Sequence, residues 1–335
     1  MKFGIFVFGD NHPDSGLSIS DYYRDVLQIG EWAEELGFRS FWIAEHHFFW
    51  FGVCPSPQMI LAALAQRTKR IKLGPAVSVL PFRHPLITAE EYALVDQLCG
   101  GRLEFAIGSG FVRQEYTFFD LTFEEGRARM WEAFELILKA WTEAKFSYRG
   151  KFYRVEDGFL YMKPIQKPYP PTWIAASSDE TLVKAGELGY SIMGIPFVRS
   201  NDVSDVKAKH DLFKKAYSRA GHQGEPGISV ALHVHLQKSD QEAVESGKDF
   251  FNRYVQYYRM HGRPGWNETF ESLREKMLMV YTSVDRAVEI FKRYQETGVT
   301  EVLCMLNTGG IPMGNIRTTM EFLSKEIMPQ FAEEH

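Results

Sequence analysis

The sequence has few of the features that mark secreted, membrane-spanning or nucleic-acid-binding proteins. Three cysteines occur in 335 residues, Cys54, Cys99 and Cys304, at wide and unrelated spacings. This predicts neither a disulfide framework nor a zinc site and favours a reducing cytoplasm. The 38 basic and 43 acidic residues leave a net charge of −5, so no excess of positive charge predicts binding to nucleic acid or to an acidic membrane. The apolar run Phe3–Phe8 is too short for a signal-peptide core or a membrane span.

The usual nucleotide and hydrolase motifs are also absent. The sequence has no Walker loop, no GxGxxG after a strand and no GxSxG elbow. Phosphoryl transfer and serine hydrolysis therefore lack their signatures.

What the chain does have is a short apolar run followed by an amphipathic stretch, repeated eight times. Alternation of this kind predicts parallel strands joined by helices, and a (β/α)₈ barrel in a single domain over 1–335 fits the count. An open, doubly wound sheet is the alternative, because strand order cannot be read from sequence. The predicted strands cover residues 3–8, 41–44, 71–80, 102–107, 172–176, 190–195, 228–236 and 299–306.

Two segments exceed what a plain barrel needs, one after the fourth strand and one after the seventh. Residues 145–167 are aromatic and strand-like and lead into a proline-rich stretch, so we expect an insertion there. Residues 261–280 combine glycine and proline with an amphipathic piece. Long connections of this kind are often lids or binding loops, and we expect a lid at 261–280.

The carboxyl ends of barrel strands are where chemistry is expected. The second predicted strand ends in Glu45-His46-His47, followed by four aromatic residues. A carboxylate and imidazoles beside aromatic rings suit proton transfer next to a flat ligand. Adjacent strand residues point to opposite sides, so His46 and His47 cannot both face the cavity. Hydrogen bonding within the loop alone is an equally good interpretation of these residues.

Two further strand ends are typical of sites that hold anions. Gly108-Ser109-Gly110 permits close approach of backbone amides to a ligand, although a plain turn explains it as well. Ser177 and Ser178 stand where a helix begins, and its free N–H groups favour a phosphate. Ordinary helix capping is the simpler explanation of these serines.

A metal site is the competing hypothesis on the seventh strand. His233 and His235 are two residues apart, so both side chains leave the same face, and such a pair can ligate a metal. Because no further histidine cluster accompanies them, polar lining of the cavity is the favoured interpretation, and we assign no metal ligands.

Taken together and in order, a set of short motifs strongly resembles the bacterial luciferase-like flavin monooxygenases over essentially the whole chain. No single motif is specific, but the ordered set is. It comprises Met1–Gly4, Trp42 with Glu45–Phe48, Leu80-Pro81, His84-Pro85, Ala89-Glu90, Asp96–Leu98, Gly101–Leu103, Gly108–Phe111 with Glu115, Ser177-Ser178, Gly189 and Met328-Pro329.

The resemblance implies a (β/α)₈ barrel that binds reduced FMN supplied by a separate NAD(P)H flavin reductase. Dioxygen then gives a peroxyflavin that oxidises an organic substrate. Catalysis is implied for His46, with Glu45 beside it. The implied flavin contacts are a cis peptide at Ala76-Val77, a buried carboxylate at Glu90, further cofactor-binding positions at Ser109, Gly110 and Ala175, and phosphate contacts at Ser177, Ser178 and Thr181.

The sequence departs from the family pattern at two places. Ser109 stands where luciferase has a phosphate-binding arginine, and Arg113 is the nearby replacement we consider. Pro196 stands where luciferase has a tryptophan near the ring, so light emission is not inferred. A deazaflavin-dependent oxidoreductase and a non-catalytic flavin-binding subunit remain alternatives, although inactive partner subunits tend to lose the histidine that is retained here as His46.

The implied partners follow from the same resemblance. The aromatic-rich chain suggests a small hydrophobic organic substrate. Family members are usually dimers through the helices after strands two and three, and we expect a cytoplasmic homodimer without nucleic-acid or membrane partners. The small residues Ala62–Ala65 would permit close helix packing there, or simply pack on the barrel.

Overall fold

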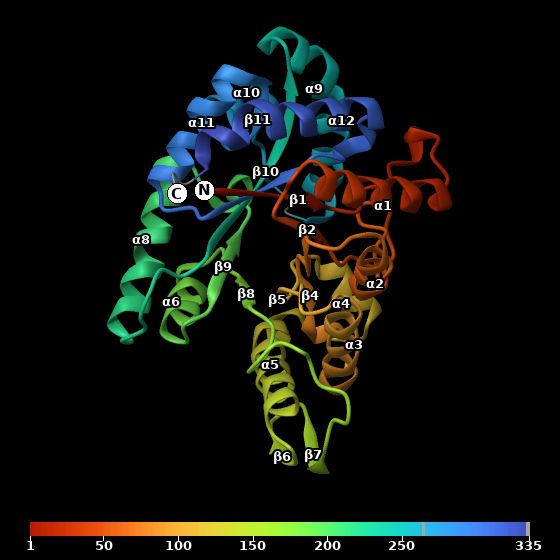
Figure 1. Ribbon diagram of the computed structural model, residues 1–335, viewed down its shortest axis with the longest axis vertical. Helices are drawn as coiled ribbons and strands as arrows, with labels where there is room; N and C mark the ends of the chain where they lie inside the picture. The colour runs from red at the N-terminus through yellow and green to blue at the C-terminus, as the bar shows by residue number, and fades with distance from the viewer. Residues whose placement is uncertain (263–264, 333–335) are drawn as a thin grey trace.

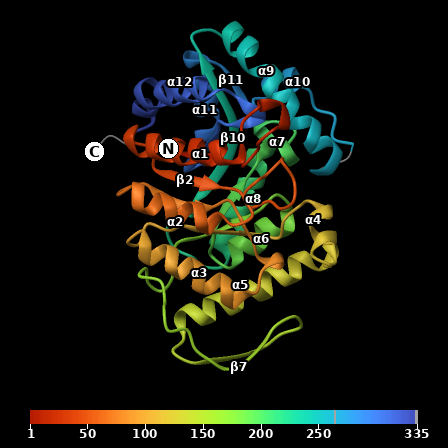
Figure 2. The same ribbon diagram turned by 90° about the vertical axis from the view of Figure 1, so that its right-hand side faces the viewer.

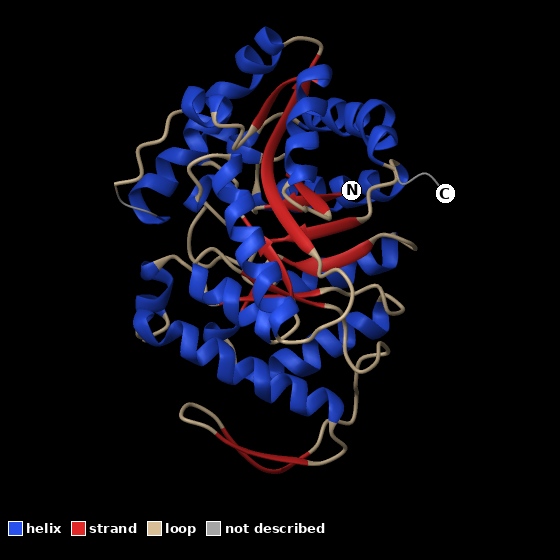
Figure 3. Cartoon of the chain, turned by 90° about the vertical axis from the view of Figure 1, so that its left-hand side faces the viewer, coloured by secondary structure: helices blue, strands red, loops and turns tan. Residues whose placement is uncertain are grey.

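Short buried runs of aromatic and β-branched residues form a ring of strands at the centre of the molecule (Figures 1 and 3). The computed structural model describes residues 1–262 and 265–332. The strands of the ring are β1 (Lys2–Val7), β2 (Ser40–Ile43), β3 (Lys72–Pro75), β4 (Ser78–Val79), β5 (Phe105–Gly108), β8 (Thr172–Ala175), β9 (Ser191–Gly194), β10 (Ile228–Gln237) and β12 (Glu301–Met305).

Every pairing between these strands is parallel, in the order β3-β2-β1-β12-β10-β9-β8-β5-β4. β3 pairs with β2 and β4 pairs with β5. The two short strands β3 and β4 therefore share one of the eight strand positions of the barrel, each of which we call a stave. A bridge between Leu73 and Leu103 closes the ring. The barrel prediction is thereby confirmed, and the open doubly wound sheet is excluded.

Helices surround the ring and leave its ends free (Figure 3). They are α1 (Ile19–Glu35), α2 (Pro57–Arg67), α3 (Pro85–Leu98), α4 (Arg113–Phe118), α5 (Gly126–Thr142), α6 (Asp179–Glu187), α7 (Pro196–Arg199), α8 (Val203–Arg219), α9 (Asp240–Tyr257), α10 (Phe270–Glu275), α11 (Val284–Glu296) and α12 (Met313–Phe322). None of the helices described here is long and apolar enough to cross a bilayer.

The first helix illustrates why these segments are helical. Ser18 caps α1 by accepting a hydrogen bond from the backbone N–H of Asp21 at 3.1 Å, which satisfies one of the free donors of the first turn. Apolar residues at steps of three and four then form the face that packs on the barrel, namely Tyr22, Val26, Ile29 and Ala33.

The connection between the seventh and eighth staves contains a strand that the sequence analysis did not predict. β10 continues past the ring, and its second half pairs with an extra strand, β11 (Val280–Ser283), before α11. Part of the segment 261–280 proposed as a lid, residues 263–264, falls outside the described residues. The amphipathic piece within it forms α10.

The segment 145–167 contains an antiparallel hairpin, β6 (Phe146–Arg149) and β7 (Arg154–Gly158), which lies apart from the barrel below α5 (Figures 1 and 2). The Glu132 side chain of α5 binds the turn of this hairpin. Its carboxylate accepts the backbone N–H groups of Lys151, Phe152 and Tyr153 at 2.8 to 3.0 Å.

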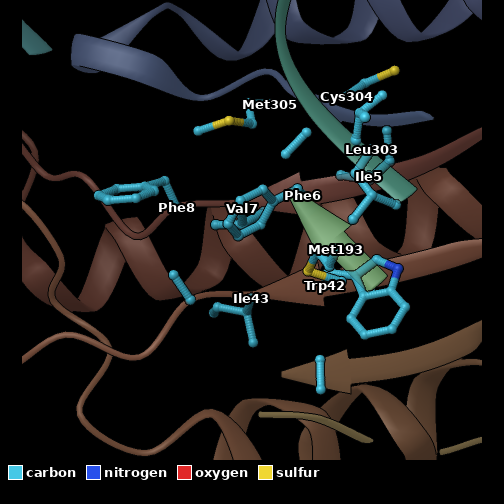
Figure 4. Packing of buried hydrophobic residues seen from close by; sticks show 14 of the residues in the cluster. Ile5, Phe6, Val7, Phe8, Trp42, Ile43, Met193, Leu303, Cys304 and Met305 are labelled. Carbon is cyan, nitrogen blue, oxygen red and sulfur yellow. The ribbon is translucent and has the colours of Figure 1, made fainter. Parts of the chain in front are cut away.

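The barrel interior is filled by large side chains rather than open (Figure 4). Phe6, Trp42, Met193 and Met305 are all buried there, and the rings of Trp42 and Trp173 meet edge to face at 6.0 Å. Gly74 is needed because a Cβ at this position would lie 2.4 Å from Trp42. A filled interior confines ligands to the rim.

The amino-terminal end of the barrel is closed by an ionic cluster. Arg39 binds Glu301 at 2.9 Å and forms a bidentate pair with Glu104, and both carboxylates are 2% exposed. Trp173 donates to Glu104 at 3.0 Å, and Ser40 donates to Glu301. Burial raises the pKa of Glu301 to about 7, against the opposing effect of Arg39.

Replacing Arg39 with methionine should destabilise the fold strongly, because two buried carboxylates would lose the cation that they share. We expect the free energy of unfolding to fall by about 3–5 kcal/mol, measured by urea unfolding at neutral pH. Arg67→Met is the matched control, since Arg67 pairs with Glu31 in solvent and should change stability by less than about 1 kcal/mol. Equal effects of the two substitutions would contradict a structural role for this cluster.

Candidate functional site at the barrel mouth

The end of β2 carries two imidazole–carboxylate pairs. Nδ1 of His46 lies 3.0 Å from Oε1 of Glu115, and Nε2 of His47 lies 3.2 Å from Oε1 of Glu45. All four side chains are buried. The other carboxylate oxygen of Glu45 accepts the backbone N–H of Val79 at 3.1 Å, so this residue joins the second stave to the third.

The two histidines have different ring neighbours and different carboxylate partners, although β2 ends at Ile43 and both lie in the loop after it rather than on the strand. The ring of His46 packs on Phe8 and Phe111, with centroids 4.9 and 5.5 Å away. The ring of His47 instead packs between Phe82 and Phe119. His46 is therefore the histidine that faces the aromatic mouth of the barrel, and its Nε2 makes no hydrogen bond among the described residues.

Glu115 is the residue whose role the sequence did not reveal. It lies in the first turn of α4, is 1% exposed, and its Oε1 also accepts the backbone N–H of His47 at 2.8 Å. Its Oε2 has no hydrogen-bond partner within the described chain. The motif set contained Glu115, but only the fold brings this carboxylate back to the β2 loop.

Three neighbouring staves form a small-residue cradle beside this pair. The Ala76-Val77 peptide bond is cis, as the resemblance implied. A Cβ on Gly108 would lie 2.5 Å from Val77 and 3.4 Å from the Cβ of Ala175. Gly110 adopts φ 74°, where glycine is favoured. The predicted cofactor residues Ala76, Val77, Ser109, Gly110 and Ala175 thus lie at the ends of adjoining staves.

The start of α6 is the second part of the predicted cofactor site. Ser178 is its N-cap, with Oγ 3.0 Å from Oγ1 of Thr181, while Ser177 is exposed. The capping interpretation is correct for Ser178, whose Oγ accepts the backbone N–H of Thr181 at 3.4 Å. The backbone N–H groups of Asp179 and Glu180 before it are left available to an anion. Arg127 of α5 pairs with Glu180 in this turn. A small recess of about 40 Å³ opens beside Ser177 and is lined in part by Arg199.

Arg113 does not take the place of the missing arginine in this structure. Its guanidinium is exposed, pairs with Glu124 at 2.8 Å and lies 4.1 Å above the ring of Phe123. Ser109 itself is half-buried, and its carbonyl accepts the hydroxyl of Tyr116.

The expectation of a buried carboxylate at Glu90 was wrong, because Glu90 is exposed on α3. That helix buries the face bearing Thr88, Ala89, Tyr92 and Val95, and Glu90 falls on the other side of the helical period. The buried carboxylates of this region are Glu45 and Glu115 instead.

The metal hypothesis for His233 and His235 also fails. Nδ1 of His233 lies 2.9 Å from Thr308 Oγ1, whereas Nε2 of His235 lies 2.8 Å from Ser246 Oγ on α9. β10 runs beyond the ring at His235, so the two histidines have different surroundings. No group of three or more potential metal ligands occurs in residues 1–262 and 265–332.

A buried acid at the end of β1 was not predicted. Oδ2 of Asp10 accepts the backbone N–H of Gly309 at 2.6 Å, and Oδ1 has no partner among the described residues. Burial raises the pKa of Asp10 to about 7, although the Gly309 N–H acts in the opposite direction. The carboxylate therefore connects the loops after β1 and β12. Because it is buried, its ionised form destabilises the folded protein.

Asp10→Asn should remove this destabilising effect. A raised folded-state pKa means that the folded protein holds the proton more tightly than the unfolded chain, so wild-type stability falls as pH rises from about 4 to about 7. The asparagine variant should match the wild type near pH 4 and exceed it near pH 8 by a few kcal/mol, on the order of the shift. Thermal unfolding across this pH range measures the difference, and parallel pH profiles would contradict the raised pKa.

Comparison with known proteins agrees with this geometry. The model of the luciferase-like monooxygenase family matches residues 1–301. A 4-hydroxyprotoasukamycin monooxygenase from Streptomyces nodosus subsp. asukaensis is 27% identical, over 88% of this chain and 82% of its own. The crystal structure of monooxygenase RslO1 from Streptomyces bottropensis is 26% identical, with a TM-score of 0.92, covering 99% of this chain and 100% of that one.

Solved structures of the same fold at lower identity include one protein in complex with FMN and one that depends on coenzyme F420. The oxygenating constituent of 3,6-diketocamphane monooxygenase from Pseudomonas putida, in complex with FMN, superposes with a TM-score of 0.85 at 22% identity and 98% coverage of both chains. The coenzyme F420 dependent tetrahydromethanopterin reductase from Methanopyrus kandleri superposes with a TM-score of 0.77 at 20% identity and 99% coverage of both chains.

Proposed function

Because the chain belongs to the luciferase-like monooxygenase family, we propose that it is the oxygenase of a two-component system. It would use reduced FMN from a separate NAD(P)H flavin reductase, together with dioxygen, to oxidise a small hydrophobic organic substrate. The observation that carries this proposal is the buried His46–Glu115 pair, which lies among aromatic rings at the barrel mouth.

The residues present fit a flavin mononucleotide. The cradle of Ala76, Val77 and Gly108 is flat and lacks bulky side chains, which suits close packing against a ring system. Ser177, Ser178 and Thr181 would hold the phosphate at the start of α6, where free N–H groups and the helix dipole favour an anion. Arg127, paired with Glu180 in that turn, is our candidate for the cation that Ser109 lacks.

The chain's own contribution is to hold and move a proton and to exclude water. When bound in its reduced form, the flavin supplies the electrons with which dioxygen delivers one oxygen atom to the substrate. Glu115 accepts a hydrogen bond from Nδ1–H of His46 and thereby fixes the tautomer in which Nε2 is free to accept a proton. Phe8, Phe51 and Phe111 around that imidazole keep water away from the reaction.

His46→Ala should abolish oxygenation while leaving the flavin bound. We expect product formation to fall about 10²- to 10⁴-fold, because the proton acceptor is lost but the cradle and α6 are untouched. The assay supplies FMN, a reductase and isotopically labelled dioxygen, and follows label in a hydrophobic compound that the wild type oxidises.

His222→Ala is the control for that experiment, since His222 lies far from β2 in the sequence and hydrogen-bonds the carbonyl of Glu187. Its activity should equal that of the wild type. Undiminished product formation by the His46 variant would remove this residue from the mechanism.

The cofactor assignment has its own test, in which FMN is compared with riboflavin, the same ring system without phosphate. Ser178→Ala combined with Thr181→Val should weaken FMN binding about tenfold, the value of one charge-assisted hydrogen bond, and leave riboflavin binding unchanged. Fluorescence titration measures both affinities. Equal weakening for the two ligands would place the phosphate elsewhere.

Deazaflavin use remains the alternative, and a comparison of reduced FMN with reduced coenzyme F420 distinguishes the two. Our proposal expects that reduced FMN, and not reduced coenzyme F420, supports oxidation of substrate that depends on dioxygen. A protein that binds coenzyme F420 and transfers hydride in the absence of dioxygen would contradict it.

We also propose a homodimer through α2 and α3. The two helices pack side by side along one flank of the molecule (Figure 2). They expose large apolar side chains there, namely Met59, Ile87, Leu94 and Leu98. A surface of this kind is typical of a protein–protein contact.

The segment 261–280 remains our candidate for a lid. Within its described part, the ring of Trp266 lies against Phe197 and Tyr258, at 5.8 and 5.3 Å. The segment therefore adds an aromatic cover to the same mouth, consistent with a closure that excludes water.

A further inference from the structure

The proposed mechanism does not use His233, a buried polar group near the barrel mouth. His233 on β10 is completely buried, and its Nε2 has no hydrogen-bond partner among the described residues. Its Nδ1 lies 2.9 Å from Oγ1 of Thr308 in the loop after β12. Burial lowers the pKa of His233 to about 3, so the imidazole is neutral at physiological pH.

An orphaned nitrogen of this kind is unusual and costs free energy. Buried polar atoms are nearly always paired, and an unpaired one loses its hydrogen bonds to water without replacement. Phenylalanine or leucine at this position would avoid the cost. A site that receives a polar group of a ligand explains why a histidine stands there, because the unpaired atom then gains its partner on binding.

The register of the barrel puts His233 near the mouth. It pairs with Met305, which in turn pairs with Phe6, and two residues after Phe6 comes Phe8, which packs on His46. Ser229 and Ala231 precede His233 on the same face of β10, so this face belongs to the interior of the ring. His233 thus lies at the top of the packed interior, on the stave opposite the flavin cradle in the strand order.

Aromatic rings connect His233 with His46. The ring of His233 lies 4.8 Å from Tyr254, Tyr254 lies 5.4 Å from Phe8, and Phe8 lies 4.9 Å from His46. Phe197 and Phe251 flank the imidazole, each at 5.0 Å. The contacts of Phe197 and Phe251 with the imidazole are tilted or edge to face, at 58° and 83°. Aromatic surroundings of this kind favour an aromatic ligand.

We propose that His233 determines substrate specificity, with its Nε2 forming a hydrogen bond to an oxygen substituent, a hydroxyl or a carbonyl, on an aromatic substrate. The proposal rests on the proposed function for the location of the reacting centre at His46. His233 would bind the distal end of the substrate and present the other end to His46. Thr308 Oγ1 can donate or accept, so either tautomer of His233 can form, and both kinds of oxygen substituent are accommodated.

A metal ion does not explain the same observation. Metal-ligating histidines occur with two or more further ligands, and neither His235 nor any carboxylate is found beside His233 among the hydrogen-bonded partners of the described residues. A substrate oxygen requires only the single free nitrogen that the structure provides.

The test uses two flat probes of similar shape, naphthol and methylnaphthalene, which differ in the oxygen substituent. Their binding to the purified full-length protein is measured by isothermal titration calorimetry, with and without FMN. The wild type should bind naphthol about tenfold more tightly than methylnaphthalene, the preference that one buried hydrogen bond provides. His233→Leu should abolish or reverse this preference, while His233→Gln, which can still form a hydrogen bond, should retain part of it.

His235→Leu is the matched control, because it removes a similarly buried histidine two residues further along β10 whose partner is Ser246. It should keep the wild-type preference. Absence of a preference in the wild type, or an undiminished preference in both His233 variants, would overturn the proposal. If His233→Leu does not fold, His233→Gln and the control decide.

Failure of this proposal and failure of the proposed function are distinguishable. Probe binding is read without turnover, so it does not depend on reduced flavin or dioxygen. A protein that oxygenates a substrate with reduced FMN but shows no naphthol preference retains the proposed function and loses the role of His233. The reverse result would support the binding site and reject the oxygenase.

Discussion

One buried carboxylate, that of Glu115, determines the geometry of the whole candidate site. Its Oε1 receives both Nδ1 of His46 and the backbone N–H of His47. An ionised carboxylate without such partners would be very costly in a buried place, so the loop after β2 can take only the conformation in which His46 turns toward the aromatic mouth. The catalytic assignment depends on this carboxylate, which reaches the β2 loop from α4.

The closed ring makes such a contact possible between residues that are far apart in sequence. Parallel staves deliver all their carboxyl ends to one rim. The His46 loop, the Ala76-Val77 peptide, the Gly108–Gly110 turn and the start of α6 thus become neighbours around that rim. The opposite rim is sealed by Arg39 with its two carboxylates. Stability and chemistry are accordingly separated at the two ends of the barrel.

The fold could be predicted from sequence because each stave and its helix carry a local hydrophobic period, and the count of eight limits the architecture. What could not be predicted depends on contacts between distant segments. The role of Glu115 requires the return of α4 to β2, and the exposure of Glu90 depends on which face of α3 meets the barrel. The extension of β10 that separates His235 from His233 is set by its pairing with β11.

The single motifs also differed in how much of the site could be predicted from them. His46 and His47 face apart, as expected for neighbouring residues of a strand, but β2 ends at Ile43 and both histidines lie in the loop that follows, where the contacts with Glu115 and Glu45 set their directions. The orphaned nitrogen of His233 and the raised pKa of Asp10 are properties of burial, which a single sequence does not reveal. The pairing of Arg127 with Glu180 joins two different helices, so it depends on a contact between distant segments that the sequence does not reveal.

The most direct test of the central claim is a crystal structure of the protein with FMN bound. The account predicts that the isoalloxazine ring lies against Ala76-Val77 with Nε2 of His46 facing it, and that the phosphate is held by the first turn of α6. A flavin bound elsewhere, or an imidazole of His46 that remains remote from the ring, would contradict the account.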